Sequence, residues 1–258
     1  MDPCVIEVIF TCKGRPYLTE LCLRRFIELM PEPYRLIICY DDMRYTHYDM
    51  LRRVAPKAIV ICRDEDDKSY FSLINHALEY ADGDLYMHTE NDFYWQRRDC
   101  LFDAMTALEM YDDLDFIRFE NLPFTDSTFT EYRTLPSDKV GVMRKDAPYQ
   151  FSFNPHLRRD KFPCGNRFKE DGFTKHDEQH FNDEYTGTSG CLFGENFRHL
   201  GLYDEGGCYK PHYAERFTLR RGEREIPFPL GEFDKFCSNV VYRQLFMRYL
   251  HEHKNSAS

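Results

Sequence analysis

The chain has 258 residues and lacks the features that mark several classes of protein. No apolar run approaches the roughly 18 residues of a membrane span, so no transmembrane helix is expected. No basic segment followed by a long apolar stretch opens the chain, so we expect no signal peptide. Dense runs of Lys and Arg are also missing, and the formal net charge is -10. Because binding to a nucleic-acid backbone needs a basic surface, nucleic acid is not an expected partner.

Paired cysteine motifs are absent as well. Ten cysteines are present, but no two of them form a Cys-x-x-Cys pair, so a structural zinc site is not indicated. Several lie in apolar runs with strand character, for example Cys39 and Cys62, where a free cysteine behaves as a small hydrophobe. The cysteine pattern therefore predicts a reducing, cytoplasmic location.

Three common catalytic and nucleotide-binding motifs are missing too. No Gly-x-Gly-x-x-Gly follows the first apolar run, and no Gly-x4-Gly-Lys-Ser/Thr occurs anywhere. These absences remove the usual markers of dinucleotide-dependent redox chemistry and of P-loop phosphotransfer. A Gly-x-Ser-x-Gly nucleophile elbow is likewise absent.

The first half of the chain alternates between strand and helix patterns. Apolar runs predict strands at residues 5–11, 36–40, 58–62, 84–88 and 116–119, and helical spacing predicts helices at 17–30, 69–80 and about 98–111. Repeated β-α-β units with nearly continuous apolar strands are typical of an α/β fold, with a mostly parallel sheet flanked by helices. The length suits a single domain spanning residues 1–258.

The second half of the chain is less regular. Residues 121–175 are rich in Pro, Gly, Asn and Asp with interleaved aromatic residues, which predicts loops and short elements packed over the sheet edge. Residues 233–253 carry apolar side chains at helical spacing and predict a closing helix. This half is a candidate acceptor-binding region.

Polar side chains follow each of the first four predicted strands. Thr11, Asp42 and Asp64 follow the first three, and Glu90-Asn91-Asp92 follows the fourth. Ligands of open α/β sheets bind outside the carboxyl ends of the strands. Two carboxylates one residue apart in such a loop suit Mg²⁺ or Mn²⁺, which take oxygen ligands from carboxylates and substrate phosphates. The alternative is an acidic loop that only keeps the strand end soluble.

Two segments of the second half carry further candidates. His176 and His180 are four residues apart, as in the zinc-binding His-Glu-x-x-His pattern, but Asp177 takes the place of the Glu. The alternatives are a solvated surface helix or a catalytic carboxylate at Asp177 or Glu178. His212 follows a glycine-rich turn and precedes Arg216 by four residues, so it is either a site histidine or a structural one.

The order of these motifs resembles the GT-A glycosyltransferases, especially family 2-like members. Over residues 4–95 the resemblance rests on Val8-Ile-Phe-Thr11 with Arg15-Pro16, Asp41-Asp42 after a strand, Ala81-Asp-Gly-Asp84, and Glu90-x-Asp92. Further on, it rests on Phe151-Ser-Phe-Asn154-Pro155, on the acids at 177–178, and on Lys210-Pro-His212 with Arg216. Glu90 departs from the usual first Asp of Asp-x-Asp. The segment at 177–178 has no distinctive signature, which leaves the stereochemical class open.

The resemblance implies a GT-A fold and a metal-dependent transfer of a sugar from a nucleotide-diphosphate sugar to an acceptor hydroxyl. About residues 1–120 would bind the nucleotide sugar, and about residues 121–258 would bind a glycan or another hydroxyl acceptor. The implied nucleotide contacts are Thr11, Arg15, Asp42, Asp64 and Glu90, and the implied ligands of Mn²⁺ or Mg²⁺ are Asp92 and His212. The transfer is expected to invert configuration, with Glu178 as the general base and Asp177 as the second choice.

Two alternatives from other classes stay open. A sugar-phosphate nucleotidyltransferase would also use a parallel sheet, a nucleotide and Mg²⁺, but normally carries a glycine-rich basic loop after the first strand. Here that loop offers only Gly14 between Lys13 and Arg15. A non-catalytic carbohydrate-binding domain would need no carboxylates arranged for a metal.

Overall fold

The structure is a computed structural model of the full chain, and it describes most of residues 5–200. The described residues are 5–12, 16–40, 45–62, 70–120, 128–147, 150–163, 165, 167–168, 181–194, 196–200, 219–221 and 224–226.

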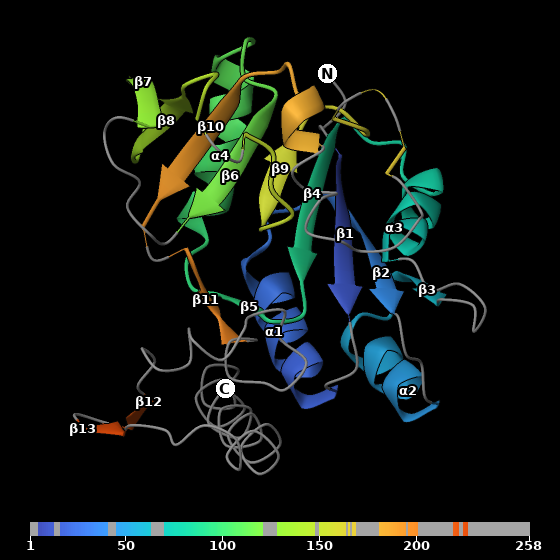
Figure 1. The fold of residues 1–258 in the computed structure, drawn as a ribbon. Helices are drawn as coiled ribbons and strands as arrows, with labels where there is room; N and C mark the ends of the chain where they lie inside the picture. The colour runs from blue at the N-terminus through green and yellow to red at the C-terminus, as the bar shows by residue number, and fades with distance from the viewer. Residues whose placement is uncertain are drawn as a thin grey trace.

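A nine-stranded sheet forms the centre of the protein (Figure 1). The strand order is β3-β2-β1-β4-β9-β6-β10-β8-β7. Its members are β1 (Ile6–Cys12), β2 (Tyr34–Tyr40), β3 (Ile59–Cys62), β4 (Leu85–Glu90), β6 (Phe116–Glu120), β7 (Phe129–Thr134), β8 (Lys139–Met143), β9 (His156–Arg158) and β10 (Ser189–Phe193). Strands β1, β2, β3 and β4 are parallel neighbours, and β6 is parallel to β10.

Strand β9 lies between β4 and β6 and runs antiparallel to both of them. Because β4 and β6 are each antiparallel to β9, they run in the same direction as each other. The carboxyl ends of β1, β4, β6 and β10 therefore meet at one edge of the sheet, which is the lower edge in Figure 1. We call this the carboxyl edge.

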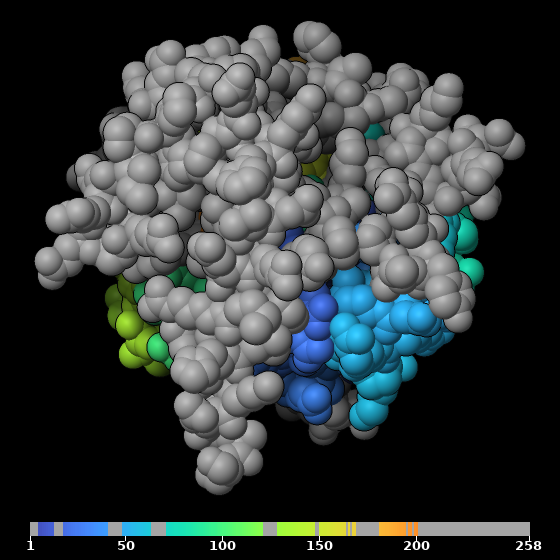
Figure 2. Space-filling view, turned by 90° about the horizontal axis from the view of Figure 1, so that it is seen from below, coloured from blue at the N-terminus to red at the C-terminus, as the bar shows by residue number. Residues whose placement is uncertain are grey.

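Helices cover both faces of the sheet. On one face, α1 (Pro16–Leu29), α2 (Tyr45–Val54) and α4 (Asp99–Met110) pack on the side of β1 that carries Ile6, Val8 and Phe10. On the other face, α3 (Tyr70–Glu79) packs around Ile9 with aromatic rings from residues 151–185. Seen from below, α1 in blue lies beside α2 in light blue (Figure 2). All seven residues of β1 are buried because both faces of the sheet are covered.

Two short two-stranded sheets complete the described elements. Strand β5 (Phe93–Trp95) pairs antiparallel with β11 (Phe197–His199), and β12 (Leu219–Arg221) pairs with β13 (Arg224–Ile226). The first pair joins the residues that follow β4 to residues about 100 positions later. The chain therefore returns to the carboxyl edge after β10.

The predicted fold class is confirmed, because the sheet is mostly parallel and flanked by helices. The predicted strands and helices of the first half agree with the observed ones to within about two residues at most ends. The second half is more regular than predicted, since β7, β8 and β9 fall within residues 121–175 and join the sheet. The closing helix predicted at 233–253 lies outside the described residues.

Among the described residues, no helix is long and apolar enough to cross a membrane.

Candidate functional site

The carboxyl edge brings together two of the residues predicted from the sequence. Thr11 on β1 is in register with Glu90 on β4, so the two side chains project from the same face of neighbouring strands. Thr11 is buried, while the Glu90 side chain is 30% exposed. Glu90 therefore presents its carboxylate to solvent beside the end of β1.

Buried histidines lie behind Glu90. His88 precedes it by two residues on the same face, and its Nε2 lies 3.7 Å from Glu90 Oε1. The His88 ring stacks on His156 of β9, with the ring centroids 5.4 Å apart and the planes 10° apart. This stacking fixes the orientation of the His88 ring, which lies against the Glu90 carboxylate.

The turn after β4 is anchored to the start of the chain. The backbone N–H of Asn91 donates to the carbonyl oxygen of Thr11 at 2.9 Å, which continues the pairing of β4 with β1. The buried Asn91 side chain donates from Nδ2 to Thr19 Oγ1 on α1 at 2.7 Å. Asn91 therefore fixes the turn, and the carboxylates at 90 and 92 extend from a rigid base.

Asp92 meets a histidine that the sequence pattern did not single out. His199 Nε2 on β11 lies 3.4 Å from Asp92 Oδ2, and the two side chains are 18% and 9% exposed. The backbone N–H of Leu200 donates to the Asp92 carbonyl oxygen at 2.7 Å, and the His199 ring stacks on Phe93 at 4.5 Å. Because 107 residues separate the pair in sequence, only the β5–β11 pairing brings it together, and no local motif marks it.

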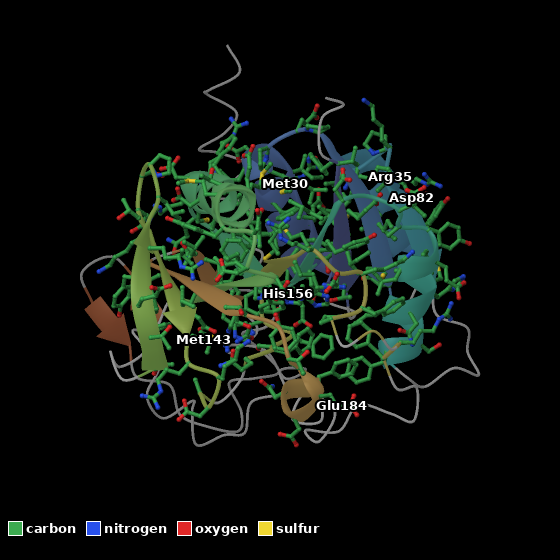
Figure 3. The ribbon with its side chains drawn as sticks, turned by 90° about the horizontal axis from the view of Figure 1, so that it is seen from above. Met30, Arg35, Asp82, Met143, His156 and Glu184 are labelled. Carbon is green, nitrogen blue, oxygen red and sulfur yellow. The ribbon has the colours of Figure 1, made fainter. Side chains whose placement is uncertain are left out.

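A buried cation occupies the centre of the same sheet face. His156 (labelled in Figure 3) donates through Nδ1 to the Asn154 carbonyl oxygen at 2.9 Å, and Arg158 donates from Nη1 to His156 Nε2 at 2.7 Å. Burial, reinforced by the charge of Arg158, holds the pKa of His156 well below its usual range. Burial also lowers the pKa of Arg158 to about 10. The neutral imidazole thus bridges two buried groups: it accepts a hydrogen bond from the Arg158 guanidinium and donates one to the Asn154 carbonyl oxygen.

Several of the predicted site residues lie outside the described residues. They are Arg15, Asp42, Asp64, Asp177, Glu178 and His212. The described ends of β2 and β3, Tyr40 and Cys62, precede Asp42 and Asp64 by two residues each. Tyr40 is in register with Cys12 at the end of β1, and Cys62 is in register with Tyr40. The roles given to these six residues stay predictions.

Within the described part of the chain, no group of three or more His, Cys, Asp or Glu side chains is arranged to hold a metal ion. The Asp92–His199 pair supplies two potential ligands. A metal bound there would need its other ligands from elsewhere, such as the phosphates of a substrate.

No family model matches the sequence, and no curated protein matches it. Solved structures of TarS from S. aureus match its fold. The structure of TarS 1-349 gives a TM-score of 0.55 at 15% identity, covering 74% of this chain and 59% of that chain. A second TarS structure gives 0.57 at 15% identity, covering 74% and 36%. The complex of TarS 1-349 with UDP-GlcNAc gives 0.52 at 13% identity, covering 75% and 60%.

The chain thus spans about three fifths of the TarS 1-349 structure that it matches. At this level of identity, the similarity shows the fold. The chain has the GT-A glycosyltransferase fold.

Proposed function

We propose that the protein is a metal-dependent glycosyltransferase that moves a sugar from a nucleotide-diphosphate sugar to a hydroxyl of a glycan or another acceptor. The observation that carries the proposal is the register of Thr11 with Glu90 at the carboxyl edge of a GT-A sheet, with Asp92 two residues further along the chain. TarS structures with UDP and with UDP-GlcNAc share this fold, which supports a nucleotide-sugar donor. The cytoplasmic location stays a prediction.

The Asp92–His199 pair fits a Mn²⁺ or Mg²⁺ ion. A carboxylate oxygen and an imidazole nitrogen 3.4 Å apart can turn toward a common ion, and Mn²⁺ accepts both ligand types. His212 is kept as a further candidate ligand. When bound, the cation would stabilise the negative charge on the departing diphosphate.

The remaining contacts with the nucleotide sugar are assigned to side chains at the carboxyl edge and in the segments that follow the strands. Thr11 and Glu90 would contact the nucleotide sugar at the ends of β1 and β4, joined by Arg15, Asp42 and Asp64. Glu90 would act as a hydrogen-bond acceptor, because a carboxylate has no proton to donate at neutral pH.

The acceptor hydroxyl needs a base on the face of the sugar opposite the leaving group if configuration inverts. Glu178 is the first candidate for that base, and Asp177 is the second. Product stereochemistry by NMR tests this assignment, because retention at the anomeric carbon would leave no role for a base in this position.

A donor screen tests the proposed function. The full chain is incubated with UDP-GlcNAc, UDP-glucose or GDP-mannose, and nucleotide release is measured with Mn²⁺ and with EDTA. We expect slow hydrolysis of at least one donor, dependent on the cation and accelerated by a suitable acceptor. Full activity in EDTA would refute metal dependence.

The same screen, extended to nucleoside triphosphates with sugar 1-phosphates, separates the two alternatives. A sugar-phosphate nucleotidyltransferase would release pyrophosphate when given a nucleoside triphosphate and a sugar 1-phosphate. A non-catalytic carbohydrate-binding domain would turn over none of these substrates.

A further inference from the structure

A second carboxylate, not predicted from the sequence, lies at the carboxyl edge. Glu120 ends β6 and is in register with Phe193 at the end of β10, so the two side chains project side by side from one face. This is the face that carries Glu90, because Tyr86 of β4 and Phe116 of β6 both pack in the cluster around Ile9. Strand β9 alone separates β4 from β6, which places Glu120 roughly 10 Å from Glu90 at about 4.8 Å per strand.

Buried groups hold Glu120 in place. Arg118, two residues earlier on the same face, forms an ion pair with Glu120 Oε1, and the two side chains are 4% and 12% exposed. Asn196 donates from Nδ2 to the Glu120 carbonyl oxygen at 3.2 Å and to that of Leu192 at 3.1 Å. The guanidinium of Arg118 is therefore buried, and the Glu120 side chain beside it keeps a small exposed fraction. Such an arrangement suits a fixed hydrogen-bond acceptor.

Two further groups extend the row of side chains. Asn154 is half-buried, and the N–H of Phe119 donates to the carbonyl oxygen of the next residue, Pro155, at 3.1 Å. Because β9 is antiparallel to β6 and His156 is in register with Arg118, Asn154, two residues before His156, lies toward the level of Glu120, two residues after Arg118. The Phe193 ring is also half-buried and packs edge-on against Phe129 at 5.1 Å. An amide, a carboxylate and an aromatic ring thus follow one another along the edge.

We propose that Glu120, Phe193 and Asn154 form an acceptor subsite that takes a pyranose sugar. The inference rests on the proposed function, and it names the chemical class of the acceptor. A pyranose carries hydroxyl donors at its rim, which Glu120 and the amide of Asn154 accept, and C–H groups on its faces, which pack on an aromatic ring. Glu120 lies roughly 10 Å from Glu90. A donor sugar bound beside Asp92 and an acceptor bound at Glu120 would therefore occupy neighbouring positions along the carboxyl edge.

The test compares Glu120→Gln with a matched control, Glu131→Gln. Glu131 forms the same kind of ion pair two residues apart on a strand, with Arg133 Nε at 2.7 Å, but on β7, where its side chain is 51% exposed. The probes are methyl and p-nitrophenyl pyranosides, and two readouts are used. The first is the KM of each pyranoside in transfer, and the second is saturation-transfer NMR of the pyranoside with no nucleotide present.

We expect Glu120→Gln to raise the pyranoside KM about 10- to 100-fold, because a charged hydrogen bond to the ligand is lost. Donor hydrolysis in water should be unchanged, and Glu131→Gln should behave as the wild type. Phe193→Leu keeps the Arg118–Glu120 pair intact and should also weaken the NMR signal, which guards against misfolding of the first variant.

An unchanged KM in Glu120→Gln would overturn the subsite, and so would a wild-type protein to which no pyranoside binds. Failure of the proposed function gives a different result. In that case the wild type hydrolyses no donor, while pyranoside binding that depends on Glu120 is still seen by NMR.

Discussion

Replacing His156 tests the buried imidazole bridge at the centre of the sheet. In the folded protein this imidazole is neutral, since burial and Arg158 hold its pKa well below the usual value of about 6.5 that it regains on unfolding. Below pH 6.5 the unfolded state therefore binds a proton that the folded state does not bind. The free energy of unfolding must fall as the pH falls, because stability rises with pH wherever the unfolded state binds more protons.

The size of the effect follows from linkage. Each pH unit between the two pKa values is worth about 1.4 kcal/mol. For an imidazole that titrates near pH 6.5 when unfolded and stays neutral when folded, the loss between pH 7.5 and pH 5.0 sums to about 2 kcal/mol. His156→Gln removes this titration. It also lowers the free energy of unfolding at every pH by about 1 to 3 kcal/mol, because the buried Arg158 loses its hydrogen bond to His156 Nε2.

The assay is urea unfolding followed by circular dichroism at a series of pH values. The slope of the unfolding free energy between pH 5.0 and 6.5 should be shallower in His156→Gln than in the wild type. His76→Gln, at an exposed position on α3, provides the control for the loss of one histidine. Equal slopes in the wild type and His156→Gln would refute the assignment of a neutral, buried imidazole.

Two further changes test the packing that positions the site. Gly83→Ala should destabilise the fold by about 1 to 3 kcal/mol in thermal or urea unfolding, because an added Cβ would lie 2.6 Å from the Val5 carbonyl oxygen. At Gly190 an added Cβ would meet side-chain methyl groups of Ile117, Val140 and Leu114 and no backbone atom, so Gly190→Ala should cost less. The reverse order of the two costs would contradict this reasoning. Asn91→Ala should cost about 1 to 3 kcal/mol through loss of the buried bond to Thr19. A double-mutant cycle with Thr19→Val should then be non-additive, and strict additivity would show that the bond contributes nothing.

The first half of the fold could be predicted from the sequence because its signals are local. Continuous apolar runs such as 36–40 and helical spacing such as 17–30 each identify an element without reference to the rest of the chain. The insertion of β9 between β4 and β6 could not be predicted this way. Strand β9 has only three residues, His156–Arg158, and two of their side chains are polar or charged, so the sequence shows no strand pattern there. These residues form a strand because they pair with β4 and β6.

The residues of the candidate site likewise divide into those that local sequence signals predict and those that they do not. Thr11 and Glu90 lie at the carboxyl ends of β1 and β4, and Asp92 follows β4, so the general rule for parallel sheets places them at one edge. His199 and Glu120 escaped notice for different reasons. His199 reaches Asp92 only through the long-range β5–β11 pairing. Glu120 directly follows the strand predicted at 116–119, but it is a single acid and not part of a closely spaced pair such as Glu90-x-Asp92.

The most direct test of the central claim is calorimetric titration of UDP and GDP into the full chain with and without Mn²⁺. It is repeated with Asp92→Asn and with the control Asp112→Asn, whose exposed carboxylate lies between α4 and the start of β6. The account predicts cation-dependent nucleotide binding in the wild type and in Asp112→Asn, reduced at least tenfold in Asp92→Asn. Equal nucleotide affinity in Mn²⁺ and EDTA, or an Asp92→Asn protein that binds as tightly as the wild type, would contradict it.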